Sequence, residues 1–269
     1  MKFYENAMLR SIALPLLKKI GRDITIKHHF TGDSLLLHSY RHKGYWYHGK
    51  HREESTIEMF KKCVKQGNNV IEVGGHIGYM SLLFAQLAGE KGKIFVFEPG
   101  INNLPYIREN IKKKTNVQLI EKGAGDKNET ATFFMDNLTG QNNSFVEDFD
   151  GFKNNQSASY DKSSGLTKVE VPIITLDSFV SSENINNVNF IKIDVEGFEY
   201  EVLLGAKELL KKYHPSIMVE VQRNQAPLAD FLFELNYKLY DDNGLQLDKK
   251  GIESCNSQNV FAFFNEENK

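Results

Sequence analysis

An apolar run that breaks into glycines and continues as a helical pattern constrains this chain more than any other feature. The apolar run covers residues 70–73, the glycines are Gly74, Gly75 and Gly78, and apolar residues recur at helical spacing over 79–87. A strand that turns sharply into a helix beneath a ligand needs backbone conformations and close approaches that a β-carbon would block. The pattern predicts a nucleotide-binding β-α-β unit, with Gly74 and Gly75 in the turn and Gly78 letting the helix approach the sheet.

A second apolar run, residues 94–97, ends in Glu98 and Pro99. Glu98 lies about 20 residues beyond Gly78, and a carboxylate at that strand tip can accept hydrogen bonds from both hydroxyls of a ribose. The helix that begins at Tyr79 offers the free backbone N–H groups of its first turn to a polar ligand. We therefore expect a ligand that contains a ribose.

Glu72 distinguishes this turn from a dinucleotide site. A G-x-G-x-x-G motif that ends at Gly78 requires glycine at position 73, where this chain has Val73. An acid at position 72 would face a pyrophosphate badly, because two like charges would be brought together. It suits a cationic amino group, such as that of the methionine part of S-adenosylmethionine. We predict S-adenosylmethionine as the cofactor.

The totals favour one large α/β domain with an N-terminal addition, because the chain has 269 residues of which 41% are apolar. The formal net charge of −2 gives no global field that would attract nucleic acid, so we predict no nucleic-acid partner. Cys63 and Cys255 offer neither a disulfide framework nor metal-ligand spacing. They favour a reducing compartment, and we expect a cytoplasmic protein.

Residues 1–52 are interpreted as an N-terminal cap made of a helix and short strands. Residues 8–20 resemble a short amphipathic helix that packs against the domain, with peripheral membrane contact as the alternative. Residues 24–47 alternate apolar and polar side chains, which predicts short strands of a hairpin around residues 31–33. Six histidines fall in the cap, but their spacing does not indicate a metal site.

The cap also contains an aromatic trio at residues 45–47. Tyrosine and tryptophan rings stack on the apolar face of a sugar while their polar tips bond its hydroxyls, although they are also ordinary packing residues. Trp46 and Tyr47 are therefore predicted to bind the acceptor.

Residues 53–269 alternate helical and strand patterns, which predicts a parallel sheet covered by helices on both faces. Helices are expected over 53–65, 79–88, 104–114, 200–212 and 226–235, and strands over 70–73, 93–97, 117–121, 189–196, 216–221, 237–240 and 260–264. The last pair of strands is expected to be antiparallel, because no crossover helix separates them.

Two loops of this domain are expected near the ligand. The turn at residues 123–126 follows the third strand, so we expect Ala124 against an adenine ring and Asp126 accepting from its amine, unless Asp126 is an ordinary turn residue. Residues 137–168 are rich in Asn, Ser, Gly and Asp without a clear period. Such a long loop is usually functional or disordered, and we predict an acceptor lid flanked by strands over 131–135 and 169–174, with disorder as the alternative.

Asp194 lies at the end of the fourth strand that faces the expected ligand crevice, and Lys192 lies two residues earlier on the same side. Such a pair suits acid–base chemistry or the binding of acceptor hydroxyls, with an ion pair that orders the turn as the alternative. Glu220, near the end of the fifth strand, is expected to converge with Asp194. Two carboxylates could hold a divalent metal or share a proton. No third ligand is evident, and we predict no metal.

At this point several segments together resemble the FkbM family of S-adenosylmethionine-dependent methyltransferases. They are Glu72–Tyr79, Phe97–Pro99, Asn110, Ala124, Leu176–Asp177 and Lys192–Glu199, in this order. The resemblance implies the class I methyltransferase fold, a Rossmann-like, seven-stranded, mostly parallel sheet with one antiparallel strand. It also implies O-methylation of sugars or polyketide-type hydroxyls. The family usually has Asn where this chain has His76, which offers an imidazole near the methyl group.

The sequence thus predicts an S-adenosylmethionine-dependent O-methyltransferase that acts on a hydroxyl of a sugar, a glycan or a related small molecule by in-line transfer. Asp194 is the predicted general base and His76 the second candidate, while Lys192 orients the acceptor or tunes Asp194. The expected cofactor contacts are Glu72, Gly74, Gly75, His76, Gly78, Tyr79, Glu98, Pro99, Ala124, Asp126 and Asp194. The expected acceptor contacts are Trp46, Tyr47, Glu196 and Glu220.

Two other classes were weighed. A nicotinamide-dependent short-chain dehydrogenase would share the β-α-β unit but requires Tyr-x-x-x-Lys, and no tyrosine in this chain has lysine four residues on. A non-catalytic glycan- or partner-binding module with a vestigial cofactor site is the remaining alternative.

Overall fold

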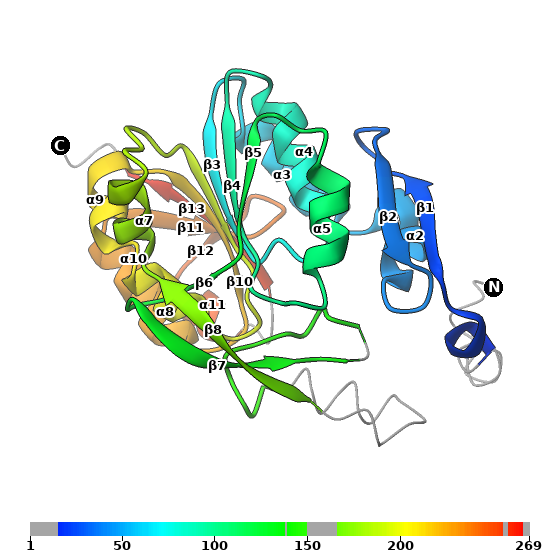
Figure 1. Ribbon diagram of the computed structural model, residues 1–269. Coiled ribbons are helices and arrows are strands. Elements are labelled where there is room, and N and C mark those ends of the chain that lie inside the picture. Colours follow the sequence, from blue (N-terminus) through cyan, green and yellow to red (C-terminus); the bar gives the residue numbers. More distant parts are fainter. Residues whose placement is uncertain (1–15, 138, 150–165, 255–257, 266–269) are drawn as a thin grey trace.

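The computed structural model describes residues 16–137, 139–149, 166–254 and 258–265, and it shows a central sheet with helices on both faces (Figure 1). This is the α/β class that the alternating pattern predicts. The main sheet has eight strands in the order β12-β11-β13-β10-β9-β3-β4-β5. Their bounds are β3 Asn69–Val73, β4 Lys93–Phe97, β5 Val117–Ile120, β9 Phe190–Ile193, β10 Ser216–Val221, β11 Tyr237–Tyr240, β12 Gln246–Leu247 and β13 Gln258–Phe264.

Strands β3, β4, β5, β9 and β10 are mutually parallel, and β13 runs antiparallel to both β10 and β11. All seven predicted strands are therefore present, with the predicted antiparallel pair. The structure adds β12 beyond β11. A strand of two residues is too short to show a period, so the sequence pattern did not reveal it.

The chain changes direction across the sheet at β3. It runs outward from β3 through β4 to β5 and then returns to β9 on the other side of β3. Connections that leave in opposite directions open a crevice at the carboxyl ends of the two central strands. Val73 is paired with both Phe97 and Ile193, so the residues that follow, Gly74, Glu98 and Asp194, emerge at the same level.

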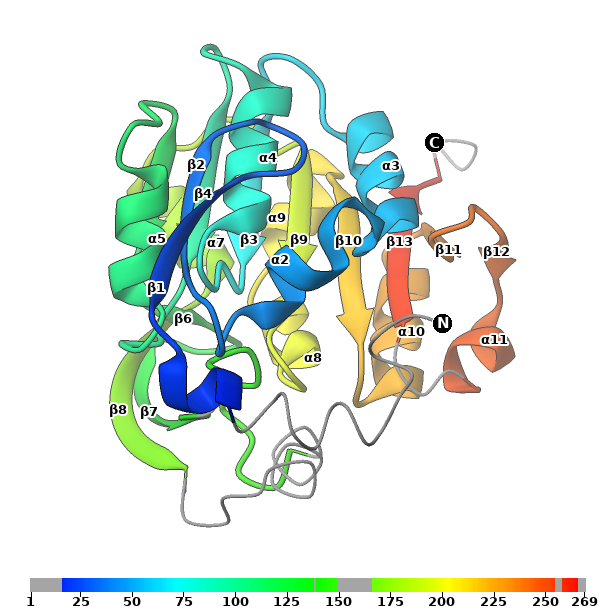
Figure 2. The ribbon, with the colours of Figure 1, turned by 90° about the vertical axis from the view of Figure 1, so that its right-hand side faces the viewer.

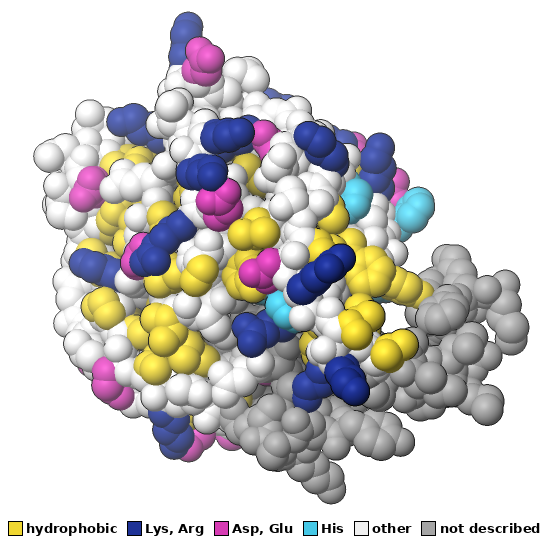
Figure 3. All heavy atoms as spheres, turned by 45° about the vertical axis from the view of Figure 1, so that its right-hand side comes forward, with side chains coloured by type: hydrophobic (Ala, Val, Ile, Leu, Met, Phe, Trp, Pro, Cys, Tyr) yellow, Lys and Arg dark blue, Asp and Glu magenta, His cyan; other side chains and the backbone are white. Residues whose placement is uncertain are grey.

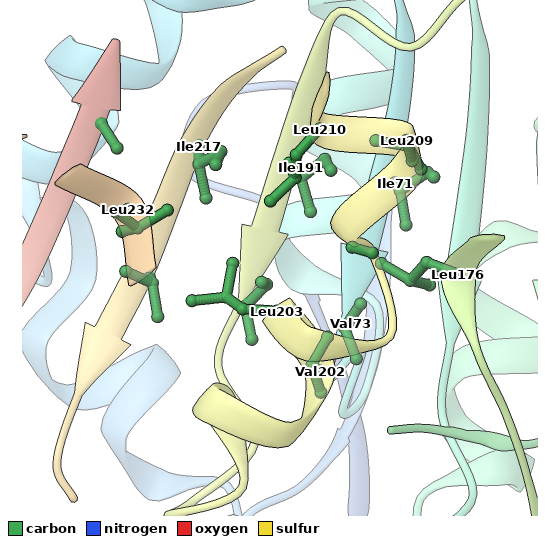
Figure 4. Close-up of a cluster of buried hydrophobic side chains, with 14 of the residues drawn as sticks. Ile71, Val73, Leu176, Ile191, Val202, Leu203, Leu209, Leu210, Ile217 and Leu232 are labelled. Carbon is green, nitrogen blue, oxygen red and sulfur yellow. The ribbon is translucent and has the colours of Figure 1, made fainter. Parts of the chain in front are cut away.

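Helices cover the two faces of the sheet as separate layers, one on each side in Figure 1. One layer has α3 Glu54–Cys63, α4 Tyr79–Ala88 and α5 Leu104–Ile111, and the other has α7 Leu176–Ser182, α8 Glu199–Leu204, α9 Lys207–Tyr213, α10 Gln225–Glu234 and α11 Lys249–Glu253. Strand side chains alternate between the layers, so Ile71 and Val73 pack toward α8 and α9 while Val70 packs toward α3 and α4. Figure 4 shows Ile71, Ile191 and Ile217 in the hydrophobic cluster between the sheet and the layer that contains α8 and α9.

The helix expected over 200–212 is interrupted. Helix α8 ends at Leu204 and α9 begins at Lys207, with Gly205 between them. A β-carbon at Gly205 would lie 1.9 Å from the carbonyl oxygen of Gly125. The close approach of these two backbones explains the glycine at this junction.

Near the N-terminus, β1 (Asp23–Lys27) and β2 (Ser34–His38) pair antiparallel around the expected turn. The strand pattern does not continue as predicted, because α2 (Lys43–His48) is a helix that η2 (Gly49–His51) follows. Asn110 of α5 ties β2 to the domain, since its side chain accepts from the Leu36 N–H (2.6 Å) and donates to the Leu36 carbonyl (2.9 Å).

Most of the helix expected over 8–20 lies outside the described residues. The division of the chain at residue 52 stays a prediction. Over the described residues, no helix combines the length and the apolar character that crossing a membrane requires. The face in Figure 3 mixes acidic and basic side chains with hydrophobic ones.

A small second sheet lies beside the main one, in the order β6-β8-β7. Its strands are β6 Gly123–Ala124, β7 Glu129–Met135 and β8 Thr167–Ile174. Strands β7 and β8 match the strands expected to flank the predicted lid. Of the predicted lid itself, position 138 and residues 150–165 lie outside the described residues.

The Gly74 position yields a stability prediction. Gly74 has a φ of 90°, and an added β-carbon would lie 1.9 Å from the carbonyl oxygen of Asp194. Gly74→Ala is therefore expected to lower the free energy of unfolding by about 3 kcal/mol, through backbone strain and overpacking together. Urea unfolding at neutral pH measures the change.

Gly244→Ala is the matched control, because Gly244 has a φ of 85° with nothing within 4 Å of an added β-carbon. The conformational strain alone is expected to cost about 1 kcal/mol. Equal losses in the two variants would contradict the close contact between Gly74 and Asp194.

Candidate functional site

A cavity of about 260 Å³ opens at the carboxyl ends of β3, β4 and β9. Its walls come from the turn after β3, the tips of the neighbouring strands, the segment 140–145 and the residues around α2. Of the residues that the sequence predicted, Gly74, His76, Glu98, Pro99, Ala124, Lys192, Asp194, Glu196 and Glu220 line this cavity. The structure therefore brings together side chains from both informative motifs.

The glycine turn wraps the tip of β4. The N–H groups of Gly74 and Gly75 both donate to the carbonyl of Phe97, each at 3.0 Å. Unlike the prediction, Gly75 and Gly78 do not line the cavity. Added β-carbons would meet Ile107 of α5 at 2.9 Å and 3.0 Å respectively. These glycines let α5 approach the turn, whereas Gly78 was expected to face the sheet.

Glu98 is buried and holds the turn in place. Its Oε2 accepts the His76 N–H at 2.7 Å, and its Oε1 accepts the Gly100 N–H at 2.8 Å and the Asn103 amide at 3.2 Å. A carboxylate has about four lone-pair sites, so about one is left for a ligand hydroxyl, where the sequence predicted two. Burial raises the pKa of Glu98 to about 7, against the lowering effect of these hydrogen bonds.

Lys192 and Asp194 form an ion pair at the wall of the cavity. Lys192 Nζ lies 2.9 Å from Asp194 Oδ2 and donates to the Gly74 carbonyl at 3.4 Å. The Lys192 side chain is 5% exposed, whereas that of Asp194 is 34% exposed. Burial opposes ionisation of Asp194, but the Lys192 ammonium outweighs it and holds the Asp194 pKa well below its usual range. Asp194 therefore presents an ionised, accessible carboxylate.

Glu72 lies beneath this pair and does not line the cavity, in contrast to the prediction. It is opposite Lys192 in the register of β3 and β9, and it accepts a hydrogen bond from Ser81 at 2.6 Å. Burial raises the Glu72 pKa to about 7, while Lys192 and Ser81 lower it. The neighbouring strand β9 places Lys192 directly opposite Glu72, so this carboxylate compensates the buried ammonium and does not reach the cavity.

Glu196 adds a third carboxylate to the predicted pair of Asp194 and Glu220. Single oxygens of the three side chains lie within 4.8 Å of one another. Burial and the charge of Asp194 raise the pKa values of Glu196 and Glu220, and protonated Glu220 is hydrogen-bonded to Asp194. Gln222 donates to Glu196 at 3.0 Å. The cluster therefore favours ionisation of Asp194 alone, and the charge of Asp194 disfavours ionisation of Glu196 and Glu220.

The cap residues at the cavity differ from those predicted. Tyr45 and Arg52 line it, while Trp46 and Tyr47 do not. Trp46 donates from its ring nitrogen to the Ser39 carbonyl at 2.8 Å, and Tyr47 is exposed. Successive residues of a helix point about 100° apart, so only one member of the aromatic trio faces the cavity. Recognising 43–48 as a helix would have identified Tyr45.

Tyr79 and Asp126 also lie outside the cavity lining, in contrast to their predicted contacts with the cofactor. The Tyr79 carbonyl accepts from His28 Nε2, and its hydroxyl is hydrogen-bonded to His29 Nδ1, both at 3.1 Å. It therefore packs against the cap. Asp126 is exposed on the turn after β6, because β6 leaves the main sheet to pair with β8.

Asparagines that the sequence analysis missed join the 140–145 segment to the site. Asn103 donates to the Gly140 carbonyl at 3.0 Å, and Asn143 donates to Asn102 Oδ1 at 2.8 Å. Ser144 then donates to the Glu196 carbonyl at 2.6 Å. The segment spans the cavity wall from Glu98 to the acidic cluster. These contacts join residues about 40 positions apart, and no local sequence pattern predicts them.

The sheet order, the switch at β3 and the site at its carboxyl edge define a Rossmann-like, class I methyltransferase fold. A family model described as the Methyltransferase FkbM domain matches residues 72–239, which is more than half of the chain. The chain belongs to the FkbM methyltransferase family. The resemblance inferred from the motifs is thereby confirmed.

The individual relatives have low sequence identity to this chain. "Methyltransferase 1" of Beauveria bassiana is 29% identical over 171 residues, which are 60% of this chain and 67% of that protein. The "2-O-methyltransferase NoeI" of Sinorhizobium fredii is 25% identical over 195 residues, 68% of this chain and 79% of that protein. A crystal structure of an FkbM methyltransferase from Methylobacillus flagellatus aligns with a TM-score of 0.47 and 14% identity. That alignment covers 77% of this chain and 50% of the other.

The ion pair yields a prediction for Lys192→Met. Removing one partner of a buried pair leaves the other uncompensated, so this variant is expected to lose about 3–5 kcal/mol of unfolding free energy at pH 7. Adding Asp194→Asn to it should restore part of that loss, because the unpaired carboxylate is then gone. Chemical denaturation of both variants checks the prediction, and a Lys192→Met protein as stable as the wild type would contradict it.

Proposed function

We propose that this protein is an S-adenosylmethionine-dependent O-methyltransferase that acts on a hydroxyl of a sugar, a glycan or a related small molecule. One observation carries the proposal: Glu98 and the ionised, accessible Asp194 line a single cavity on either side of the glycine turn. Glu98 suits a ribose hydroxyl, and Asp194 suits the hydroxyl that is methylated. The relative from Sinorhizobium fredii is named as a 2-O-methyltransferase, which supports O-methylation.

The residues around the cavity fit an adenosine-containing cofactor. Glu98 retains about one free lone-pair site for a ribose hydroxyl. Apolar surfaces from Phe97, Ala124, Phe133 and Phe145 line the same cavity and suit a purine. Glu98, Pro99 and Ala124 would hold the adenosine part, and Gly74 and His76 the methionine part.

S-adenosylmethionine, when bound, supplies a methyl group on a sulfonium that is already a good leaving group. The chain then has to align an acceptor oxygen and take its proton. Asp194 accepts a hydrogen bond from the acceptor hydroxyl, and Lys192 keeps that carboxylate ionised and oriented. A carboxylate with so low a pKa is a weak base toward an alcohol. Asp194 therefore takes the proton late, when methylation has made the oxygen strongly acidic.

The cofactor assignment predicts saturable binding of S-adenosylmethionine in calorimetric titration. Glu98→Ala is expected to abolish that binding, and NADH is not expected to compete. No binding by a demonstrably folded wild-type protein would contradict the proposal and favour a non-catalytic binding module.

The Glu98 pKa of about 7 gives this binding a pH dependence. The ionised carboxylate is the better acceptor for a ribose hydroxyl, so affinity is expected to rise roughly tenfold between pH 6 and pH 8. Glu98→Gln removes this titration but keeps the side-chain shape. The affinity of Glu98→Gln should be weaker, and its pH dependence should follow only the titration of the ligand itself. If Glu98→Gln showed the same pH dependence as the wild-type protein, the assignment would be wrong.

Asp194→Asn is predicted to lower methyl transfer on the order of 100-fold or more, because the amide cannot take a proton. Transfer from radiolabelled S-adenosylmethionine to a panel of mono- and disaccharides measures this loss, with calorimetry showing that the cofactor still binds. Asp230→Asn is the matched control. Asp230 is an exposed partner of Lys249 outside the cavity, so its loss should leave activity unchanged. Full turnover by Asp194→Asn would show that Asp194 is not the base.

A further inference from the structure

The contact between Tyr45 and His76 has no part in the reaction described above. The Tyr45 hydroxyl lies 2.9 Å from His76 Nδ1, and the two rings are stacked with centroids 5.8 Å apart. The Arg52 guanidinium lies 4.5 Å from the centroid of the Tyr45 ring. Tyr45, Arg52 and His76 all line the cavity, so the cap contributes directly to its wall.

This hydrogen bond selects one tautomer of His76. Tyr45 is 7% exposed, and burial raises its pKa to about 12, so its hydroxyl keeps the proton. Among the described residues, His76 Nδ1 is the one acceptor for that hydroxyl. If Nδ1 carried the proton, both the Tyr45 O–H and the bare Nε2 would be left without a partner within the described part of the chain, whereas donation by Tyr45 leaves only the Nε2–H unpaired. Each unpaired buried group costs about 1–3 kcal/mol, so Tyr45 donates and Nδ1 accepts. Burial, with His42 and Arg52 nearby, lowers the His76 pKa and keeps the imidazole neutral. Its single proton is therefore on Nε2.

The Nε2–H group of His76 is a buried donor without a partner among the described residues. The residue cannot turn away easily, because its backbone has a φ of 48° and its own N–H is held by Glu98 at 2.7 Å. A non-glycine residue in this left-handed region is uncommon and marks a conformation that its surroundings impose. His76 lines the cavity, and its unpaired Nε2–H is a buried donor that a ligand oxygen would satisfy.

We propose that His76 donates a hydrogen bond from Nε2 to an oxygen of a bound ligand, and that Tyr45 is the positioning residue that sets this tautomer. The oxygen comes either from the carboxylate of S-adenosylmethionine or from the acceptor. This inference rests on the proposed function. It replaces the expectation that His76 is a second candidate base, because a nitrogen that carries a proton cannot accept another.

The tautomer can be measured without any ligand. In protein labelled with ¹⁵N-histidine, long-range ¹H–¹⁵N spectra distinguish a protonated ring nitrogen from a bare one, and the His76→Gln spectrum identifies the His76 signals. Wild-type protein should show a bare Nδ1 and a protonated Nε2. Tyr45→Phe removes the donor, so both tautomers should become populated. A protonated Nδ1 in the wild-type protein would overturn the inference, whether or not S-adenosylmethionine binds.

The donor role is tested by comparing His76→Gln with His76→Leu. Both side chains carry the same backbone strain, but only the glutamine amide can place an N–H near the position of Nε2. His76→Leu should weaken binding about tenfold or more, whereas His76→Gln should stay within about fivefold of the wild type. If His76 were a base, glutamine would lose turnover as severely as leucine while S-adenosylmethionine still bound, and the proposal would fail.

The same pair of variants identifies the ligand oxygen. A weaker calorimetric affinity of His76→Leu for S-adenosylmethionine assigns it to the cofactor carboxylate. An unchanged cofactor affinity with a raised KM for the saccharide assigns it to the acceptor. Unchanged values of both would overturn the proposal. Failure of wild-type protein to bind S-adenosylmethionine would instead count against the proposed function, and the spectra would still decide the tautomer.

Discussion

The buried ammonium of Lys192 is the interaction on which the rest of the site depends. A charge removed from water must be compensated on several sides, and here Asp194, the Gly74 carbonyl and Glu72 surround it. These partners lie directly after β9, in the glycine turn and in β3. Compensating one cation therefore aligns the ends of the two central strands. It also keeps Asp194 ionised, and the charge of Asp194 in turn raises the pKa values of Glu196 and Glu220.

Glu98 joins this arrangement to the ligand side of the cavity. Its carboxylate holds the backbone of His76 and, through Asn103, the carbonyl of Gly140. The acid expected to bind a ribose is thus also the group that fixes the turn and part of the neighbouring segment. Binding and folding share one network, and a ligand hydroxyl at Glu98 would complete hydrogen bonds that the protein has already oriented.

Much of this arrangement follows from short sequence patterns. The β-α-β unit and the crevice positions of Glu98 and Asp194 were predictable, because they depend on local periodicity and on the rule that parallel strands end together. The partner of Glu72 was not predictable: within the predicted strand its side chain lies beside Lys192 of the neighbouring strand and not at the cavity, and that pairing depends on the order of the strands.

The cap is a second place where local sequence patterns did not predict which residues reach the cavity. Residues 43–48 form a helix, so Tyr45 reaches the cavity and Trp46 does not. Contacts such as that between Asn103 and Gly140 join distant segments through single polar side chains, and no sequence periodicity predicts them.

Two histidines of the cap, His28 and His42, take part in this packing. His28 and His42 are almost fully buried, and the Nδ1 atoms of both accept backbone N–H groups. Burial lowers the pKa of His28 to about 4 and that of His42 to about 3, so both are neutral acceptors at neutral pH. An unfolded histidine titrates near 6.5, so their contribution to stability is complete above that pH and is lost as the pH falls toward 4. The His28 contact with the first turn of α4 holds the cap where Tyr45 can reach His76, so the cavity wall depends on these imidazoles remaining uncharged.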